Sequence, residues 1–325
     1  MRLINTQTYK VTEFLDSIPD YAILSHTWGS DELSLQQWQL MKPSALPKCP
    51  KSGCQKVLEA CALARQDKFN YIWVDTVCID KTSSTELSEA INSMFSWYRL
   101  SKICYAYLAD VEPISNHGLS ESSFRSSRWF TRGWTLQELL APRRLVFFAR
   151  DWSHLGDLFH LSVMVSDVSG IPKGYLCHSV PLSSASVGQK LSWVSNRVTT
   201  RLEDIAYCML GLLDVNMTPL YGEGKKSFVR LQEELIKASD DHTLAPGSML
   251  SVDPVTFYDC GSFSQSQSLC SFYPYATNNL GLSIRLPLFD TFGTGFFSVN
   301  VMHHCIHETT SSVTCFYITQ QNPLV

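Results

Sequence analysis

The sequence predicts an α/β fold: a mostly parallel β-sheet flanked by helices, then a helical segment and a small β-prone C-terminal extension. Over the first 150 residues, short apolar runs rich in β-branched and aromatic residues alternate with amphipathic stretches. This alternation implies right-handed crossovers between parallel strands that are covered on both faces. Because the pattern changes after that point, we expect an α/β domain over residues 1–155, a helical accessory segment over 156–243 and the extension over 244–325.

Four short apolar runs are the predicted strands of the sheet. They are residues 21–25 (YAILS), 71–79 (YIWVDTVCI), 103–111 (ICYAYLADV) and 145–149 (LVFFA). Apolar residues at helical spacing predict the connecting helices, at residues 53–67, 86–101 and 131–140. Ser83, with Glu86 three residues later, forms a capping box that starts the second helix, and Pro142 closes the third.

The accessory segment is predicted to be helical. Helical patterns cover residues 155–166, 186–196, 202–213 and 225–239. Thr200, with Glu203 three residues later, is expected to cap the third of these helices. In the extension, apolar residues alternate with period two, which predicts short strands around residues 282–288, 299–301 and 313–317.

The composition is that of a globular chain with little net charge. Hydrophobic residues make up 45 % of the 325 residues, charged residues 17 %, and the formal net charge is -4. A chain with this charge balance lacks the excess of basic residues that attracts nucleic acid or anionic lipid. The N-terminus lacks a signal-peptide pattern, and no stretch approaches the roughly 18 apolar residues of a spanning helix. We therefore expect a soluble, cytoplasmic protein without a membrane span or a nucleic-acid partner.

The eleven cysteines include several inside apolar runs and no Cys-x-x-Cys pair, which fits reduced core thiols better than a disulfide framework. Cys49, Cys54 and Cys61 come nearest to the spacing of metal ligands. No His follows them at the interval of a zinc finger, so we expect no metal site.

Three stretches, taken together and in order, resemble one known family. They are residues 21–29 (YAILSHTWG), 71–98 (YIWVDTVCIDKTSSTELSEAINSMFSWY) and 127–142 (SRWFTRGWTLQELLAP). The family is the fungal heterokaryon-incompatibility (HET) domain, and residues 199–235 look like the segment that commonly follows it. This resemblance implies a role in non-self recognition between fungal strains, with programmed death of the fused cell.

HET domains are in turn similar to Toll/interleukin-receptor (TIR) domains, of which some cleave NAD and others are self-associating adaptors. The stretch SRWFTRGWTLQELL resembles the TIR segment in which a Ser-x-Trp-Cys element is followed by Glu-Leu. With Trp129 at the Trp position, Phe130 replaces the Cys and the Glu comes several residues late. With Trp134 there, the spacing to the Glu fits, but Thr135 replaces the Cys. Either way, the resemblance places the NAD-cleaving carboxylate at Glu138 and implies a TIR-like, flavodoxin-like sheet.

Residue chemistry alone leaves two interpretations of this helix. Trp134 and Glu138, at positions i and i+4, share the side opposite the leucine stripe. In the functional interpretation, the indole stacks a heterocycle and the carboxylate stabilises an oxocarbenium-like transition state when an N-glycosidic bond breaks. In the structural interpretation, the indole packs under the following segment and Glu138 pairs with Arg132 or Arg143.

A turn directly after the first predicted strand is a second candidate for ligand contacts. It consists of Ser25, His26, Thr27, Trp28 and Gly29. In a parallel sheet this turn lies at the carboxyl edge, where backbone N–H groups and hydroxyls can meet a phosphate or a ribose. His26 can serve there as an acid or an anion partner, or as a structural hydrogen-bond donor.

Two carboxylates and an arginine complete the candidate ligand-binding residues. Asp75, placed within the second predicted strand, is either a member of a buried network or a site residue. Asp80, just past the end of that strand, belongs to a turn or contacts the ligand. Arg132, together with Arg128, either binds a pyrophosphate bidentately or forms surface ion pairs. The chain contains no Gly-rich phosphate loop and no Gly-x-Ser-x-Gly elbow.

These features lead to one hypothesis and one alternative. The hypothesis is an incompatibility-type cell-death protein that hydrolyses NAD, with Glu138 as the catalytic residue, NAD as the substrate and no bound cofactor. The alternative is a non-catalytic adaptor that signals death by self-association. Both versions require a non-self recognition partner that the sequence does not identify.

Overall fold

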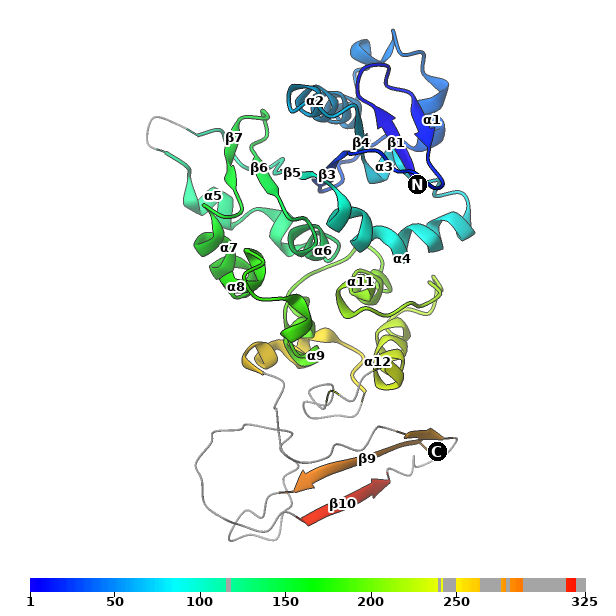
Figure 1. The fold of residues 1–325 in the computed structure, drawn as a ribbon, viewed down its shortest axis with the longest axis vertical. Helices are drawn as coiled ribbons and strands as arrows, with labels where there is room; N and C mark the ends of the chain where they lie inside the picture. Colours follow the sequence, from blue (N-terminus) through cyan, green and yellow to red (C-terminus); the bar gives the residue numbers. More distant parts are fainter. Residues whose placement is uncertain are drawn as a thin grey trace.

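The computed structural model describes residues 1–114, 118–238, 241 and 250–263, and three strands in the C-terminal extension. The main sheet has seven strands in the order β2-β1-β4-β3-β5-β6-β7 (Figure 1). Helices flank it, so the predicted α/β class is confirmed.

The centre of the sheet consists of four parallel strands. They are β3 (Ala22–His26), β4 (Tyr71–Trp73), β5 (Ile103–Tyr107) and β6 (Leu145–Phe148). Numbered along the chain, their spatial order is 2-1-3-4, which is the flavodoxin-like order. Every residue of β3 and β6 is buried, as expected for strands covered on both faces.

The outer strands are antiparallel and were not predicted. They are β1 (Arg2–Asn5), β2 (Val11–Glu13) and β7 (His154–Asp157). The prediction of one helix over residues 155–166 is therefore wrong in its first half, where β7 pairs with β6. The helix α7 (Ser162–Ser169) begins only after a turn in which Asp157 accepts a hydrogen bond from the His160 amide. A strand as short as β7 forms because it pairs with β6, and the intrinsic β-propensity of its own residues matters less.

The second predicted strand is shorter than expected. It ends at Trp73, and Asp75 opens the short helix α3 (Asp75–Cys78) instead of lying within the strand. A continuous apolar run does not distinguish a buried strand from a buried helical turn. Similarly, the helix predicted at 131–140 is a 3₁₀ turn, η2 (Arg128–Thr131), followed by α6 (Thr135–Leu140).

The remaining helices of the α/β part cover the sheet and its loops. They are α1 (Leu35–Leu40), η1 (Leu46–Lys48), α2 (Ser52–Gln66), α4 (Ser84–Leu100) and α5 (Glu121–Arg125). Ser83 caps α4 by accepting a hydrogen bond from the Glu86 amide, as predicted. The Glu86 carboxylate does not complete a capping box, because it accepts from the Asp80 amide and from Arg2.

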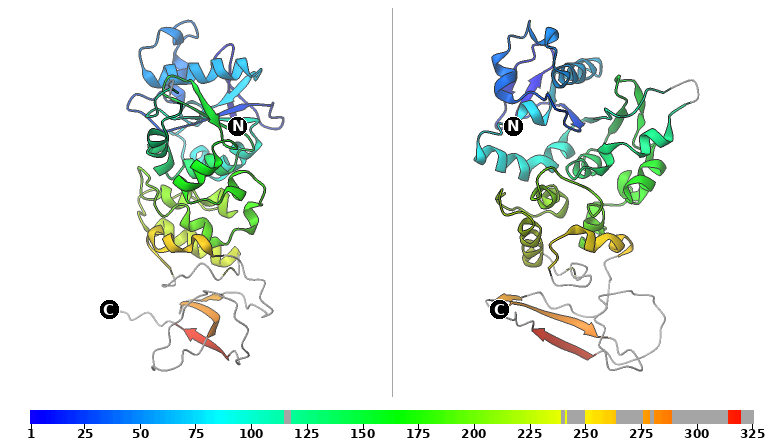
Figure 2. Two further views of the ribbon diagram at one scale, coloured as in Figure 1. Left: turned by 90° about the vertical axis from the view of Figure 1, so that its left-hand side faces the viewer. Right: turned by 180° about the vertical axis from the view of Figure 1, so that it is seen from behind.

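The accessory segment is helical, and Figure 2 shows its helices gathered on one side of the sheet domain. Its elements are α8 (Lys173–Leu176), η3 (Leu182–Ser184), α9 (Val187–Ser192), α10 (Asp204–Tyr207), α11 (Leu210–Leu213) and α12 (Lys226–Ala238), with η5 (Pro254–Ser262) after it. The single helix predicted at 202–213 is two short helices. Glu203 does not form the expected capping box with Thr200, because its side chain accepts from the amides of Gly222 and Gly224.

A second, antiparallel sheet lies in the extension. Its strands are β8 (Ala276–Asn278), β9 (Gly281–Leu288) and β10 (Thr314–Thr319). The strands β9 and β10 match the period-two patterns at 282–288 and 313–317, and residues 299–301 lie outside the described residues.

Candidate functional site

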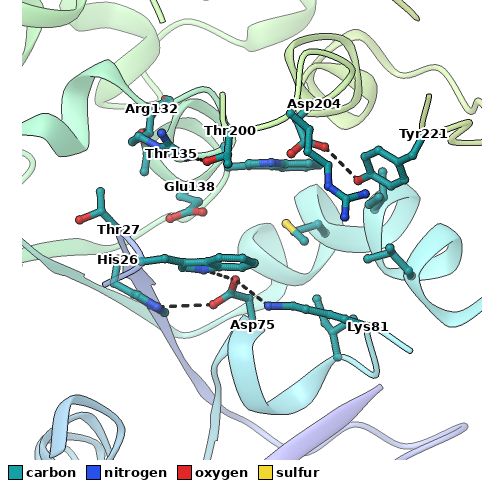
Figure 3. Close-up of a pocket in the computed structure, with 17 residues that line it drawn as sticks. His26, Thr27, Asp75, Lys81, Arg132, Thr135, Glu138, Thr200, Asp204 and Tyr221 are labelled. Atoms are coloured by element: carbon teal, nitrogen blue, oxygen red, sulfur yellow. Dashed lines mark hydrogen bonds and ion pairs between the residues drawn. The ribbon is translucent and has the colours of Figure 1, made fainter. Parts of the chain in front are cut away.

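A cavity of about 270 Å³ opens at the carboxyl ends of β3 and β4, between the sheet domain and the accessory segment (Figure 3). Its wall consists of His26, Thr27, Trp28, Asp75, Ile79, Lys81, Leu87, Ile91, Met94, Arg132, Trp134, Thr135, Glu138, Thr200, Arg201, Asp204 and Tyr221. The carboxyl edge of parallel strands is where open α/β sheets bind ligands.

The Glu138 carboxyl, carried by α6, is the most deeply placed charge on this wall. Its residue is 7 % exposed, and Oε2 accepts a hydrogen bond from the Ser25 hydroxyl at 2.5 Å. Ser25 in turn accepts from the Trp129 indole N–H at 2.8 Å. Burial raises the pKa of Glu138 to about 8, and the nearby Asp75 charge adds to the rise, whereas the Ser25 hydrogen bond opposes it. At neutral pH this carboxyl is therefore mostly protonated.

Trp28 is held in place by two charged side chains. Its indole N–H donates to Asp75 Oδ2 at 2.8 Å, and the Lys81 ammonium lies 3.6 Å from the centre of its ring. Lys81 Nζ is also 4.0 Å from Asp75 Oδ2. Although Trp28 is 55 % exposed, these contacts restrict its ring to one orientation at the cavity wall.

His26 is buried with both ring nitrogens lacking a hydrogen-bond partner among the described residues. Its Nε2 lies 3.7 Å from Asp75 Oδ1 and 4.0 Å from Glu32 Oε1, which is beyond hydrogen-bond distance. Burial and the nearby Lys56 charge hold its pKa well below the usual value, more than offsetting the Glu32 carboxylate. The imidazole is therefore neutral, and both ring nitrogens are themselves buried, so they do not face the open cavity.

The opposite wall comes from the accessory segment and the start of α6. The Tyr221 hydroxyl donates to Asp204 Oδ1 at 2.9 Å, and the Arg201 guanidinium lies 4.3 Å from the centre of the Tyr221 ring. Burial raises the pKa of Asp204, and hydrogen bonding from Tyr221 and from the Trp134 indole opposes the rise. In Figure 3, Asp75 and Asp204 lie on opposite sides of the cavity, with Glu138 between them.

The structure brings together seven of the eleven residues predicted for the site. These are His26, Thr27, Trp28, Asp75, Arg132, Trp134 and Glu138. Of the structural interpretation, the ion pair with Arg132 or Arg143 does not form, because the described hydrogen bond of Glu138 goes to Ser25, whereas the Trp134 indole does meet Asp204 of the following segment.

The other four predicted residues do not line the cavity. Ser25 and Trp129 are fully buried behind the Glu138 carboxyl, so they position it and do not meet a ligand. Asp80 accepts hydrogen bonds from Thr82 in a turn, and the amide of Gly29 donates to Glu32.

Ten wall residues were not predicted from the sequence, and six of them are polar: Lys81, Thr135, Thr200, Arg201, Asp204 and Tyr221. Four of them belong to the accessory segment. The only local signal was the Tyr-Gly-Glu-Gly turn at residues 221–224, which follows a helix and marks a tight connection.

The described residues contain neither a cluster of metal ligands nor a membrane-spanning helix. No three His, Cys, Asp or Glu side chains of that part of the chain are arranged as metal ligands, so Cys49, Cys54 and Cys61 form no such group. None of its helices is long and apolar enough to cross a membrane.

Fold and cavity together define the class: an α/β domain with a cavity at the carboxyl edge of its parallel strands, completed by a helical accessory segment. Residues 21–123 match the family described as Heterokaryon incompatibility protein (HET). The chain is also 46 % identical, over 233 residues, to Vegetative incompatibility protein HET-E-1 of Podospora anserina. It therefore belongs to the heterokaryon-incompatibility family.

The match to that relative covers 70 % of this chain but only 17 % of the relative's own length. No solved structure matches the chain significantly.

Proposed function

We propose that this protein acts in fungal non-self recognition and triggers cell death by hydrolysing NAD in the cavity. The observation that carries the proposal is Glu138, a buried carboxyl with a pKa raised to about 8 by burial, which faces a cavity of about 270 Å³ beside Trp134. Perturbed carboxyl groups in clefts are typical of sites that move protons or stabilise cations.

In the proposed reaction, the bond between the ribose C1′ and the nicotinamide N1 breaks, and its electron pair stays on nicotinamide. The positive charge that was on the nicotinamide ring then develops on the sugar, where the ionised Glu138 carboxylate stabilises it. A water molecule adds to C1′ and loses a proton, so the products are ADP-ribose, nicotinamide and one proton. The cationic nicotinamide ring favours ionisation of Glu138 when the substrate binds.

The walls of the cavity support such a ligand. Trp134 and Trp28 both line it, and an indole face attracts a flat, cationic ring.

The test is the NAD content of a heterologous cell, measured by mass spectrometry with protein abundance matched. The wild-type chain is expected to deplete NAD and to kill, and Glu138→Gln is expected to do neither. Glu59→Gln is the matched control, because Glu59 is exposed on α2, away from the cavity.

Two results contradict the proposal. Killing by folded Glu138→Gln at wild-type level excludes catalysis through this carboxyl. Death without loss of NAD favours the self-associating adaptor instead.

A further inference from the structure

The cavity is partly open to solvent, and it is too small to enclose a whole dinucleotide. Its volume of about 270 Å³ lies just below the roughly 300–1,000 Å³ of typical small-molecule sites, so it admits a heterocycle with a ribose. The remainder of a larger ligand must extend along the mouth of the cavity. The side chains at the mouth then contact this remainder and contribute to ligand specificity.

Two guanidinium groups from distant parts of the chain line the same cavity. Arg132 comes from the end of η2 and Arg201 from the accessory segment just before α10. Arg132 Nη2 donates to Thr200 Oγ1 at 2.6 Å, and Arg201 stacks on the Tyr221 ring. Within the described residues neither guanidinium makes an ion pair, so most of their hydrogen-bond donors are available to a ligand.

The wall that carries Arg201 is held by partly buried hydrogen bonds. The Glu203 carboxylate accepts from the amides of Gly222 and Gly224, at 2.8 and 2.9 Å, and so fixes the turn that contains Tyr221. Both glycines have positive φ, 106° and 59°, which this turn requires. Asp204 then fixes the Tyr221 hydroxyl, so the ring on which Arg201 stacks has one orientation.

We propose that Arg132 and Arg201 together bind the phosphate groups of the ligand, and that the accessory segment thereby selects phosphorylated nucleotides over nucleosides. A planar guanidinium fork matches the geometry of phosphate oxygens. This inference rests on the proposed function, because it takes the nicotinamide riboside part to lie against Glu138. It assigns Arg201 a role in substrate recognition.

The experiment compares the affinity of the full-length chain for two probes by isothermal titration calorimetry. ADP-ribose carries the phosphates, and nicotinamide riboside carries none. Arg132→Ala and Arg201→Ala are each expected to weaken ADP-ribose binding about tenfold or more and to leave nicotinamide riboside binding unchanged. Arg144→Ala, at an exposed arginine outside the cavity, is expected to change neither affinity.

Wild-type affinity for ADP-ribose in both cavity variants, or no binding of ADP-ribose by the wild type, overturns the inference. Arg201→Lys keeps the charge without the fork, so an intermediate loss supports bidentate recognition. NAD hydrolysis by the same preparations separates this inference from the proposed function. Binding without hydrolysis contradicts only the reaction, whereas hydrolysis with an unchanged KM in Arg201→Ala contradicts only the phosphate site.

Discussion

The Glu138 carboxyl is buried, so water does not stabilise its ionised form. Its neighbours determine how far its pKa rises. Burial is the largest cause of the rise to about 8, and the Asp75 charge acts in the same direction. The Ser25 hydrogen bond and the Arg197 charge act against it. The site thus combines a carboxyl that is mostly protonated at neutral pH with a means of ionising it when a cation binds.

This pKa makes the stability of the fold depend on pH in a defined direction. The folded-state pKa of about 8 exceeds the ordinary value of 4.5, so the protonated carboxyl stabilises the fold fully below about pH 4.5. That stabilisation is lost as pH rises to about 8, and each pKa unit corresponds to about 1.4 kcal/mol. The melting temperature of Glu138→Gln relative to wild type is therefore expected to increase between pH 5 and pH 8.

Differential scanning calorimetry across this pH range checks the prediction. Glu59→Gln is expected to give a difference from wild type that does not change with pH, because Glu59 is exposed. A flat difference for Glu138→Gln as well would mean that Glu138 is ionised normally in the folded protein.

Ser25 is expected to tune the same carboxyl without touching a ligand. Its hydroxyl donates to Glu138 Oε2, so Ser25→Ala removes a hydrogen bond that favours the ionised form. The midpoint of the Glu138 titration should move to higher pH. The melting temperatures of Ser25→Ala and of the Ser25→Ala, Glu138→Gln double variant are measured across the same pH range. The difference between the two, followed against pH, gives the midpoint of the Glu138 titration. Ser84→Ala, at an exposed serine on α4, should leave the midpoint unchanged.

The two helices α4 and α11 illustrate how the accessory segment approaches the sheet domain. A Cβ atom at Gly211 would lie 2.1 Å from Phe95 Cβ and 2.8 Å from Phe95 Cγ, so only glycine permits this approach. On the same helix α4, Asn92 exchanges two hydrogen bonds with the backbone of Met217, each 3.2 Å long. The helix that contributes Leu87, Ile91 and Met94 to the cavity wall is thus also held by contacts with the accessory segment.

Gly211→Ala is expected to separate α4 from α11 and to destabilise the fold by about 1–3 kcal/mol, the usual cost of overpacking. Urea unfolding measures this change in the free energy of unfolding. Gly29→Ala is the matched control, because its nearest neighbours would be 3.6 and 3.8 Å from the new Cβ. Equal stability of the two variants would show that the chain adjusts at Phe95 without cost.

Local patterns predicted the elements that are buried on both faces and missed those that depend on distant partners. The strands β3 and β6 lie within apolar runs of the sequence, as expected of strands that are buried throughout. The edge strand β7 has no such run and is defined by its pairing with β6. Likewise, Glu138 was predicted as a site residue from the sequence of its own helix. The hydrogen bond from Ser25 to Glu138 joins residues that are 113 positions apart in the sequence. Patterns within a single helix or strand do not reveal a contact between residues so far apart.

At the scale of the whole molecule, a buried arginine is among the links between the sheet domain and the accessory segment. Arg197, which is 6 % exposed, donates to the Arg132 carbonyl at 2.9 Å and to Thr135 Oγ1 at 3.0 Å. Its Nε also donates to the Trp193 carbonyl at 3.2 Å. Burial lowers the pKa of its guanidinium to about 10, so it stays charged at neutral pH. This side chain connects the accessory segment to the turn from which α6 and Glu138 begin.

We expect the sheet domain and the accessory segment to unfold together, because such links cross their contact. Hydrogen exchange measured by mass spectrometry in urea should give the same midpoint for peptides covering β3 and α10. Arg197→Met removes the three hydrogen bonds but keeps the length of the side chain. It should lower both midpoints together, to the extent that corresponds to a loss of about 3 kcal/mol or more in the free energy of unfolding. Arg144→Met should lower neither, since Arg144 is exposed and outside this contact. If Arg197→Met lowers only the α10 midpoint, the two parts fold independently, and the wall formed by Asp204 and Tyr221 can open while Glu138 remains in place.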